Sequence, residues 1–276
     1  MADQSSQASF LGATAFWTAA VRAQESARAD CLFNDPWAAV LAGEEGLHWL
    51  EQRGANTIAI VVRTRFFDEF LLRVTQQEGI GQVVLVAAGL DTRAFRLSWP
   101  AGTRLFELDQ PAVLEHKARV LAEVGAQPQC QREAIPVDLA ASWCDVLIAR
   151  GFDPRTPSAW LLEGLTFYLP NEMTARLLQD VSSLAAPGSW LGFDAVNGVM
   201  LTSPITKAWV EMQASYGAPW IGMLDAPEGF LAPLGWSVSL SQPGAEDANY
   251  GRWTLPVIPL RAPNLPHNWY IAARKD

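Results

Sequence analysis

Cysteine and histidine are scarce in this sequence, with three of each among 276 residues. Cys31, Cys130 and Cys144 are scattered and odd in number, and they form no CxxC pair or Cys/His cluster. We therefore expect neither a metal site nor a disulfide framework. A reduced, cytoplasmic setting fits this cysteine usage best.

Long apolar runs are also absent. A membrane-spanning helix needs roughly 18 consecutive apolar residues, whereas the longest run near the middle, Val83–Leu90, has only the length of a strand. Residues Met1–Phe10 lack the basic start and the apolar centre of a signal peptide. We expect no membrane partner.

Positive charge is in deficit, because the formal net charge is −9 and no stretch is rich in lysine or arginine. A nucleic acid would be repelled by such a chain rather than bound. A small-molecule partner is easier to accommodate.

Strands alternate with helices over most of the chain, which predicts βαβ units and a mostly parallel sheet. We predict a Rossmann-like α/β core over residues 81–276 and a helical N-terminal cap over residues 1–80. The expected helices include Thr14–Ala29 and Thr57–Glu78, where Phe67, Phe70, Leu71 and Val74 share one face. The expected strands are Gln82–Ala88, Arg104–Asp109, Ile135–Asp138, Ser158–Glu163, Trp190–Val196, Trp236–Leu240 and Trp269–Ala273.

A turn of small residues, Ala87–Ala88–Gly89, joins the first strand to the next helix. Small residues let a ligand approach the backbone, and a helix N-terminus offers free N–H groups. A single glycine is less than a full GxGxxG fingerprint. A plain tight turn therefore stays open as an alternative.

Acidic residues end successive predicted strands. Asp109 follows Gly89 by 20 residues, the spacing at which nucleoside-binding folds place the acid that binds both ribose hydroxyls. Asp138 ends the next strand, where an adenine ring lies in this fold, and its carboxylate can accept from the exocyclic amine. An acid that only favours the start of a helix is the alternative for Asp109.

The ordered segments VVRTRFFDEFL, VLVAAGLDTRAFRLSWP, FELDQP, PVDL and WLLEGLTFYLP resemble the leucine carboxyl methyltransferase-like family of S-adenosylmethionine-dependent O-methyltransferases. The resemblance is strong over about Thr14–Asp194. It implies a class I methyltransferase with a seven-stranded, mostly parallel sheet whose last strand is antiparallel. It also implies S-adenosyl-L-methionine as cofactor.

The same resemblance assigns roles to individual residues. Arg63 is similar to the cap arginine that binds the cofactor carboxylate, a task suited to a guanidinium. A solvated helix face is the alternative for Arg63. By position, the other implied cofactor-binding residues are Ala87, Gly89, Asp109, Asp138, Leu139 and Glu163. The family usually has glycine at the position of Ala87.

The acceptor is the least constrained part of the sequence. Topology predicts that Met200–Phe230 and Gln242–His267 lie over the carboxyl ends of the strands and form its pocket, with Trp209, Tyr216, Trp220 and Trp253 as lining candidates. Three side chains are candidate helpers in catalysis, namely Glu163, Tyr168 and His267. The resemblance implies O-methylation of a carboxylate or hydroxyl on a small molecule, with use in secondary metabolism.

Three other functions stay open on the sequence alone. Methylation at carbon or nitrogen of an electron-rich aromatic such as an indole uses the same fold. An NAD-dependent oxidoreductase shares the strand–turn–helix unit and the acid, but the sequence lacks a full GxGxxG and a recognisable catalytic pair. A non-catalytic cofactor-binding protein retains Asp109 and Asp138.

Overall fold

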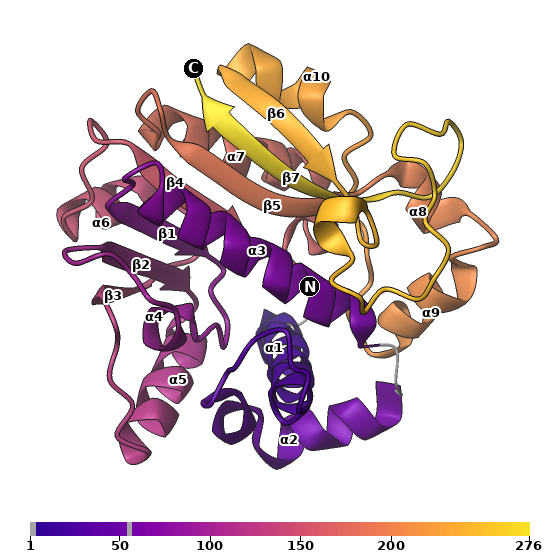
Figure 1. Cartoon of the computed structure of the whole chain (residues 1–276), viewed down its shortest axis with the longest axis horizontal. Helices are drawn as coiled ribbons and strands as arrows, with labels where there is room; N and C mark the ends of the chain where they lie inside the picture. Colours follow the sequence, from indigo (N-terminus) through magenta and orange to yellow (C-terminus); the bar gives the residue numbers. More distant parts are fainter. Residues whose placement is uncertain (1–3, 54–56) are drawn as a thin grey trace.

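A seven-stranded sheet organises the molecule, with the strand order β3-β2-β1-β4-β5-β7-β6 (Figure 1). The computed structural model describes residues 4–53 and 57–276. The strands are β1 (Gln82–Val86), β2 (Arg104–Asp109), β3 (Gln131–Pro136), β4 (Ser158–Leu162), β5 (Trp190–Val196), β6 (Trp236–Ser241) and β7 (Asn268–Lys275).

The first five strands run parallel, and β7 is antiparallel to both of its neighbours, β5 and β6. This pairing confirms the predicted Rossmann-like class I architecture with an antiparallel last strand. The helices are α1 (Gln4–Ser26), α2 (Ala38–Arg53), α3 (Ile58–Gln76), α4 (Arg93–Arg96), α5 (Pro111–Glu123), α6 (Cys144–Ala149), α7 (Asn171–Leu184), α8 (Gly198–Thr202), α9 (Lys207–Ser215) and α10 (Pro227–Leu231).

Two apolar layers cover the two faces of the sheet. Every residue of β1 is buried, and alternate side chains point to opposite faces, so Val83 and Leu85 enter one layer and Val84 and Val86 the other. The first layer contains the predicted stripe of α3, and the second contains the apolar face of α7. The helices thus bury both faces of the central strands.

Helix α3 packs directly on the sheet, although the sequence assigned it to the cap. Its stripe of Phe67, Phe70, Leu71 and Val74 is buried. Gly192 of β5 makes room for this contact, because a Cβ atom there would lie 2.7 Å from the ring of Phe70. Helices α1 and α2, which pack against each other, therefore form the cap over the carboxyl edge of the sheet.

Several boundaries differ from the predicted ones. Helix α1 begins at Gln4 and ends at Ser26, and α2 is a helix that periodicity did not single out. Strand β3 runs over Gln131–Pro136 and ends before Asp138. Within the described part of the chain, no helix is both long and apolar enough to cross a membrane.

Candidate active site

A cavity of about 240 Å³ lies at the carboxyl edge of the sheet. Each parallel strand brings an end residue to its lining: Ala87 from β1, Asp109 from β2, Asp138 after β3, Glu163 after β4 and Asp194 near the end of β5. Helices α1, α3 and α9 contribute further parts of the wall. Ligands of open α/β folds bind at this edge, so the cavity is the candidate active site.

The turn after β1 is held in a left-handed conformation. Ala87 has a φ of 53° and Gly89 a φ of 50°. Glycine adopts this region without penalty, whereas alanine carries a steric cost there. The turn directs the N–H of Gly89 at the Asp109 carboxylate, with a distance of 2.6 Å from N to Oδ2.

Asp109 is fixed by two backbone donors. Its Oδ2 accepts from Gly89, and its Oδ1 accepts from the N–H of Gln110 at 2.7 Å. Burial raises the pKa of Asp109, although these two hydrogen bonds act to lower it. Each carboxylate oxygen keeps a further lone pair, so the side chain can accept from two ligand hydroxyls.

Asp138 and Leu139 line the other end of the cavity, beyond β3. Oδ1 of Asp138 accepts from the N–H of Ala140 at 2.9 Å, and the Asp138 side chain is exposed. Because β3 is the edge strand, this end of the cavity is more open to solvent than the end near β1. A ligand group that binds the carboxylate of Asp138 therefore competes with water for it.

Arg63 reaches from α3 to the ends of β4 and β5. Its Nε donates to Oε1 of Glu163 at 2.9 Å, and its Nη1 donates to Oδ2 of Asp194 at 3.0 Å. Burial acts to lower the pKa of Arg63, but Asp194 and Glu163 raise it above the ordinary value. The two carboxylates leave Nη2 free for a further acceptor, so Arg63 can still bind a ligand carboxylate.

Arg93 connects this site to the N-terminal part of the chain. Its Nη2 lies 2.8 Å from Oε2 of Glu163, and its Nε donates to Asp68 of α3 at 2.7 Å. It also pairs with Asp91, and although burial acts to raise the pKa of Asp91, Arg93 is the main cause that lowers it to about 2.

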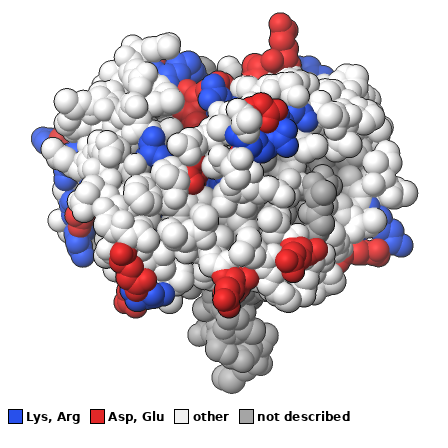
Figure 2. Space-filling model, turned by 60° about the horizontal axis from the view of Figure 1, so that its bottom comes forward, with Lys and Arg blue, Asp and Glu red and all other residues white. Residues whose placement is uncertain are grey.

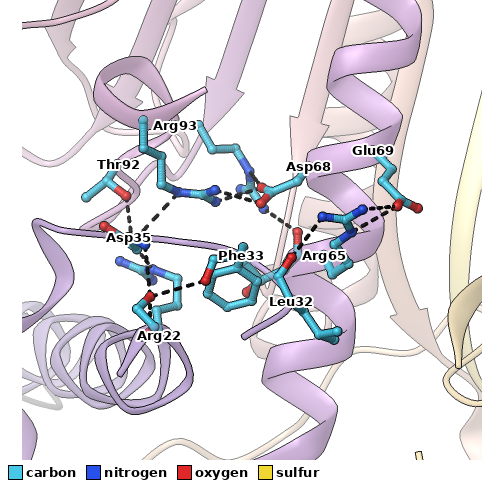
Figure 3. Close-up of polar contacts among 12 residues, drawn as sticks. Arg22, Leu32, Phe33, Asp35, Arg65, Asp68, Glu69, Thr92 and Arg93 are labelled. Atoms are coloured by element: carbon cyan, nitrogen blue, oxygen red, sulfur yellow. Dashed lines mark hydrogen bonds and ion pairs between the residues drawn. The ribbon is translucent and has the colours of Figure 1, made fainter. Parts of the chain in front are cut away.

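A buried network of ion pairs continues to α1 (Figure 3). Arg22 of α1 donates to Asp35 at 2.8 Å and to the carbonyl of Leu90 at 2.6 Å. Asp35 also accepts from Thr92 at 2.7 Å. The network joins α1, α3 and the loop after β1, and so it fixes the walls of the cavity relative to one another.

The structure brings together most of the residues that the sequence singled out. All the predicted cofactor-binding residues line the cavity, and so do Tyr168, Trp209 and Trp220. Sequence reasoning missed Asp91, Arg93, Asp194 and Gln213, which line it too. An aspartate inside the apolar segment Trp190–Val196 was the available signal for Asp194, because such a group needs a buried partner.

Three predicted residues do not reach the cavity lining. Tyr216 lies against α2, with its hydroxyl donating to the carbonyl of Gln52 at 3.1 Å. Trp253 packs against Gly244 and the apolar layer that contains α3. His267 is buried, with its ring stacked on Trp269 and its Nε2 at 2.8 Å from the carbonyl oxygen of Ala262.

The two predicted acceptor segments also differ in whether they reach the cavity lining. Residues 200–230 place Trp209, Gln213 and Trp220 in the lining, whereas no described residue of 242–267 lines the cavity. The second segment is held against α1 and α3 instead. Arg252 bonds to Glu25 of α1 at 2.9 Å, and the Tyr250 hydroxyl donates to Glu69 of α3 at 2.8 Å.

The model of the leucine carboxyl methyltransferase family matches residues 15–182 of this chain. That range contains the turn after β1, Asp109, Asp138, Arg63 and Glu163. The chain belongs to the leucine carboxyl methyltransferase family. It is 37% identical over 266 residues to a protein of Mycolicibacterium smegmatis named as an S-adenosyl-L-methionine-dependent methyltransferase, with 88% of this chain and 89% of the relative covered.

Two further relatives carry the same name. A protein of Parafrankia is 41% identical over 239 residues, covering 82% of this chain and 76% of its own length. One from Mycobacterium tuberculosis is 40% identical over 270 residues, covering 88% and 85%. This chain is accordingly an S-adenosylmethionine-dependent methyltransferase. None of these relatives supports the oxidoreductase alternative.

Solved structures share the fold of this family member. A DUF574 family protein from Streptomyces avermitilis superimposes with a TM-score of 0.61 at 13% identity, covering 94% of this chain and 97% of that one. A methyltransferase from Thermobifida fusca gives a TM-score of 0.59 at 20% identity, covering 87% and 93%. A magnesium protoporphyrin IX methyltransferase from Synechocystis, solved with S-adenosylhomocysteine bound, gives 0.52 at 13% identity, covering 84% and 95%.

The residues present fit S-adenosylmethionine as cofactor. Asp109 offers acceptors for ribose hydroxyls, Asp138 offers one for an adenine amine, and Arg63 offers a donor for a carboxylate. The described lining carries five acids (Asp91, Asp109, Asp138, Glu163 and Asp194) against three arginines (Arg22, Arg63 and Arg93). This excess of negative charge suits a ligand that carries a positively charged sulfur.

Proposed function

We propose that this enzyme transfers a methyl group to an oxygen atom on a small apolar molecule. The oxygen belongs to either a hydroxyl or a carboxylate group. The observation that carries the proposal is the division of the cavity into two ends. Asp109, Asp138 and the turn after β1 form one end over β1, β2 and β3, whereas Trp220 packs against Phe167, which follows β4, and against Trp209. An apolar aromatic wall favours a flat or aliphatic small molecule over a charged protein tail.

The surface supports a small acceptor as well. On the face drawn in Figure 2, acidic and basic side chains are scattered and separated by wide uncharged areas. A nucleic acid requires a continuous basic surface for its phosphates. We propose no nucleic-acid partner. The three cysteines are unpaired thiols, which supports a cytoplasmic setting.

The chain contributes alignment and charge rather than covalent chemistry. The cofactor, when bound, supplies a methyl group on a positively charged sulfur, and this sulfur is the leaving group when an acceptor oxygen attacks the methyl carbon in line. Asp109 and Arg63 bind the two ends of the cofactor and so fix the direction of attack. The apolar side chains around Trp209 and Trp220 exclude water from the acceptor end.

Glu163 is better suited to positioning than to accepting a proton. Both of its oxygens pair with guanidinium groups, Oε1 with Arg63 and Oε2 with Arg93. These two pairs fix the orientation of the carboxylate and engage both of its oxygens. Tyr168 is the remaining predicted helper in the lining, whereas His267 is bonded elsewhere. A carboxylate acceptor needs no base, and a hydroxyl acceptor has Tyr168 within the same cavity.

Removing Asp109 tests the cofactor assignment. We expect wild type to bind S-adenosylhomocysteine with micromolar affinity, about −8 kcal/mol. Asp109→Ala removes two hydrogen bonds from a charged acceptor, each worth about 1.5–3 kcal/mol, whereas Asp138→Ala removes one that water can replace. Calorimetric titration should show a far larger loss for Asp109→Ala. Equal affinities of wild type and Asp109→Ala would show that the ribose assignment is wrong.

Methylation at nitrogen or carbon of an aromatic such as an indole uses the same cavity. It is separated from O-methylation by locating the transferred methyl group with mass spectrometry and NMR, after turnover on paired phenols and indoles.

A further inference from the structure

The amide of Gln213 is buried in the cavity wall without a partner for its carbonyl oxygen. Gln213 lines the cavity and is 1% exposed, and its Oε1 has no hydrogen-bond partner among the described residues. It follows Trp209 by one helical turn, so both side chains lie on the cavity face of α9. An unsatisfied buried acceptor costs free energy. Because Oε1 is closed off in this structure, a ligand donor would pair with it once the amide turns toward the cavity.

Aromatic rings belong to the same wall. Trp220 packs against Phe167 with ring centroids 4.5 Å apart and against Trp209 at 6.0 Å. All three rings line the cavity. Such rings favour a flat aromatic ligand, because stacked and edge-on ring contacts add to the gain from burying apolar area.

The charges around the cavity disfavour an anionic acceptor. The described lining contains three arginines and neither lysine nor histidine. Each arginine is already paired: Arg22 with Asp35, Arg63 with Glu163 and Asp194, and Arg93 with Asp91 and Asp68. A carboxylate that entered beside Gln213 would therefore meet excess negative charge, because the free Nη2 of Arg63 is already assigned to the cofactor carboxylate.

We propose that the methyl acceptor is an uncharged aromatic compound with a hydroxyl group that donates a hydrogen bond to Oε1 of Gln213. The inference rests on the proposed function and narrows its choice of acceptor to the hydroxyl. Gln213 acts here as a specificity residue, because a site built to pair with a hydroxyl rejects an analogue that lacks it. Its amide takes no proton in the reaction.

Three naphthalene probes test the proposal by binding to the full chain saturated with S-adenosylhomocysteine. Naphthol carries the donor, its methyl ether lacks it, and naphthoate carries a negative charge. We expect wild type to bind naphthol about tenfold or more tightly than either of the others. Similar affinity for naphthoate and naphthol would overturn the proposal. So would the absence of binding by all three probes.

Substitutions at Gln213 then assign the preference to its oxygen. Gln213→Met has a similar shape but no acceptor, so naphthol and its ether should bind about equally while S-adenosylhomocysteine affinity stays unchanged. Gln213→Glu retains an acceptor oxygen and should keep the preference for naphthol. Lys207→Met, on the exposed side of the same helix, is the control and should behave as wild type.

Thermal unfolding separates this role from a structural one. Because Gln213→Met removes an unsatisfied buried group, its Tm should equal or exceed that of wild type. A clear fall in Tm, or a naphthol preference that survives in Gln213→Met, would overturn the inference. A wild-type chain that binds no S-adenosylhomocysteine would instead overturn the proposed function.

Discussion

At the scale of single residues, Ala87 is placed against its own conformational preference. Its φ of 53° lies in the left-handed region, which costs an L-residue with a Cβ atom about 1–2 kcal/mol. The residue directly follows β1 and lines the cavity, so the strain is located at the candidate ligand site.

We expect Ala87→Gly to stabilise the fold. Relief of the strain exceeds the roughly 0.4–1 kcal/mol that glycine costs through the unfolded chain, so the net gain should be up to about 1 kcal/mol. Ala118→Gly is the matched control, because Ala118 is exposed in the middle of α5 and its loss should destabilise by about 1 kcal/mol. Urea unfolding of the three proteins measures both changes. A loss of stability in Ala87→Gly would show that the turn is not strained.

At the scale of elements, the apolar strands and helices were predictable and the charged ones were not. Gln82–Ala88 contains β1 and Trp190–Val196 matches β5, because buried strands read as apolar runs. Strand β3 begins with Gln131, Arg132 and Glu133, and only its last residues carry an apolar signal. It lies at the edge of the sheet, so polar side chains are tolerated there.

The residues of the candidate site were also predictable only in part. Residues at strand ends, such as Asp109 and Glu163, were predictable because the fold brings those ends to one edge. Partners that depend on tertiary contacts were not: Asp194 sits inside a strand, and Gln213 lies on a helix without a motif. The loop over residues 242–267 was predicted to cover the acceptor, but Arg252 and Tyr250 attach it to acids on α1 and α3.

Helix α3 offers a direct comparison of a buried and an exposed ion pair at adjacent positions. Asp68 bonds to Arg93 at 2.7 Å and to both terminal nitrogens of Arg96 at 2.6 and 2.7 Å, and its side chain is 4% exposed. Glu69 pairs with Arg65 at 2.7 Å and accepts from the Tyr250 hydroxyl at 2.8 Å, and its side chain is 45% exposed. Removal of Asp68 leaves the buried Arg96 with only Asp35, at 3.8 Å, whereas removal of Glu69 leaves no buried charge unpaired.

We therefore expect Asp68→Ala to destabilise the protein by about 3–5 kcal/mol. Glu69→Ala, the control one residue away, should cost no more than about 1 kcal/mol. Denaturant midpoints of the two variants provide the measurement. Comparable losses would mean that the buried network contributes no more than a surface pair.

At the scale of the whole molecule, the N-terminal helix and the sheet share one ligand site. Helix α1 supplies Thr14, Trp17, Thr18 and Arg22 to the cavity wall. A Cβ atom on Gly89 would lie 3.6 Å from that of Ala15, so α1 passes directly over the turn after β1. Occupation of the cavity is thus expected to couple α1 to the core.

Hydrogen exchange should detect this coupling. We expect the amides of residues 16–22 in α1 to exchange more slowly when S-adenosylhomocysteine is bound, because opening α1 would then also expose the ligand. Strand β6 contributes no residue to the described lining and serves as the internal control. Equal slowing in α1 and β6 would indicate general stabilisation, and no slowing in α1 would show that the helix does not respond to the ligand.

The position of β7 between β5 and β6 has a consequence for synthesis on the ribosome. After β5 emerges, roughly 70 residues must be translated before its partner Asn268–Lys275 exists, a delay of about 4–14 s at 5–20 residues per second. During that time β5 is an open strand edge, which invites pairing with other chains. Asp194 stands within that edge. A charge within an open edge disfavours pairing with other chains, so we expect the carboxylate that anchors Arg63 in the folded protein to reduce aggregation of the nascent chain.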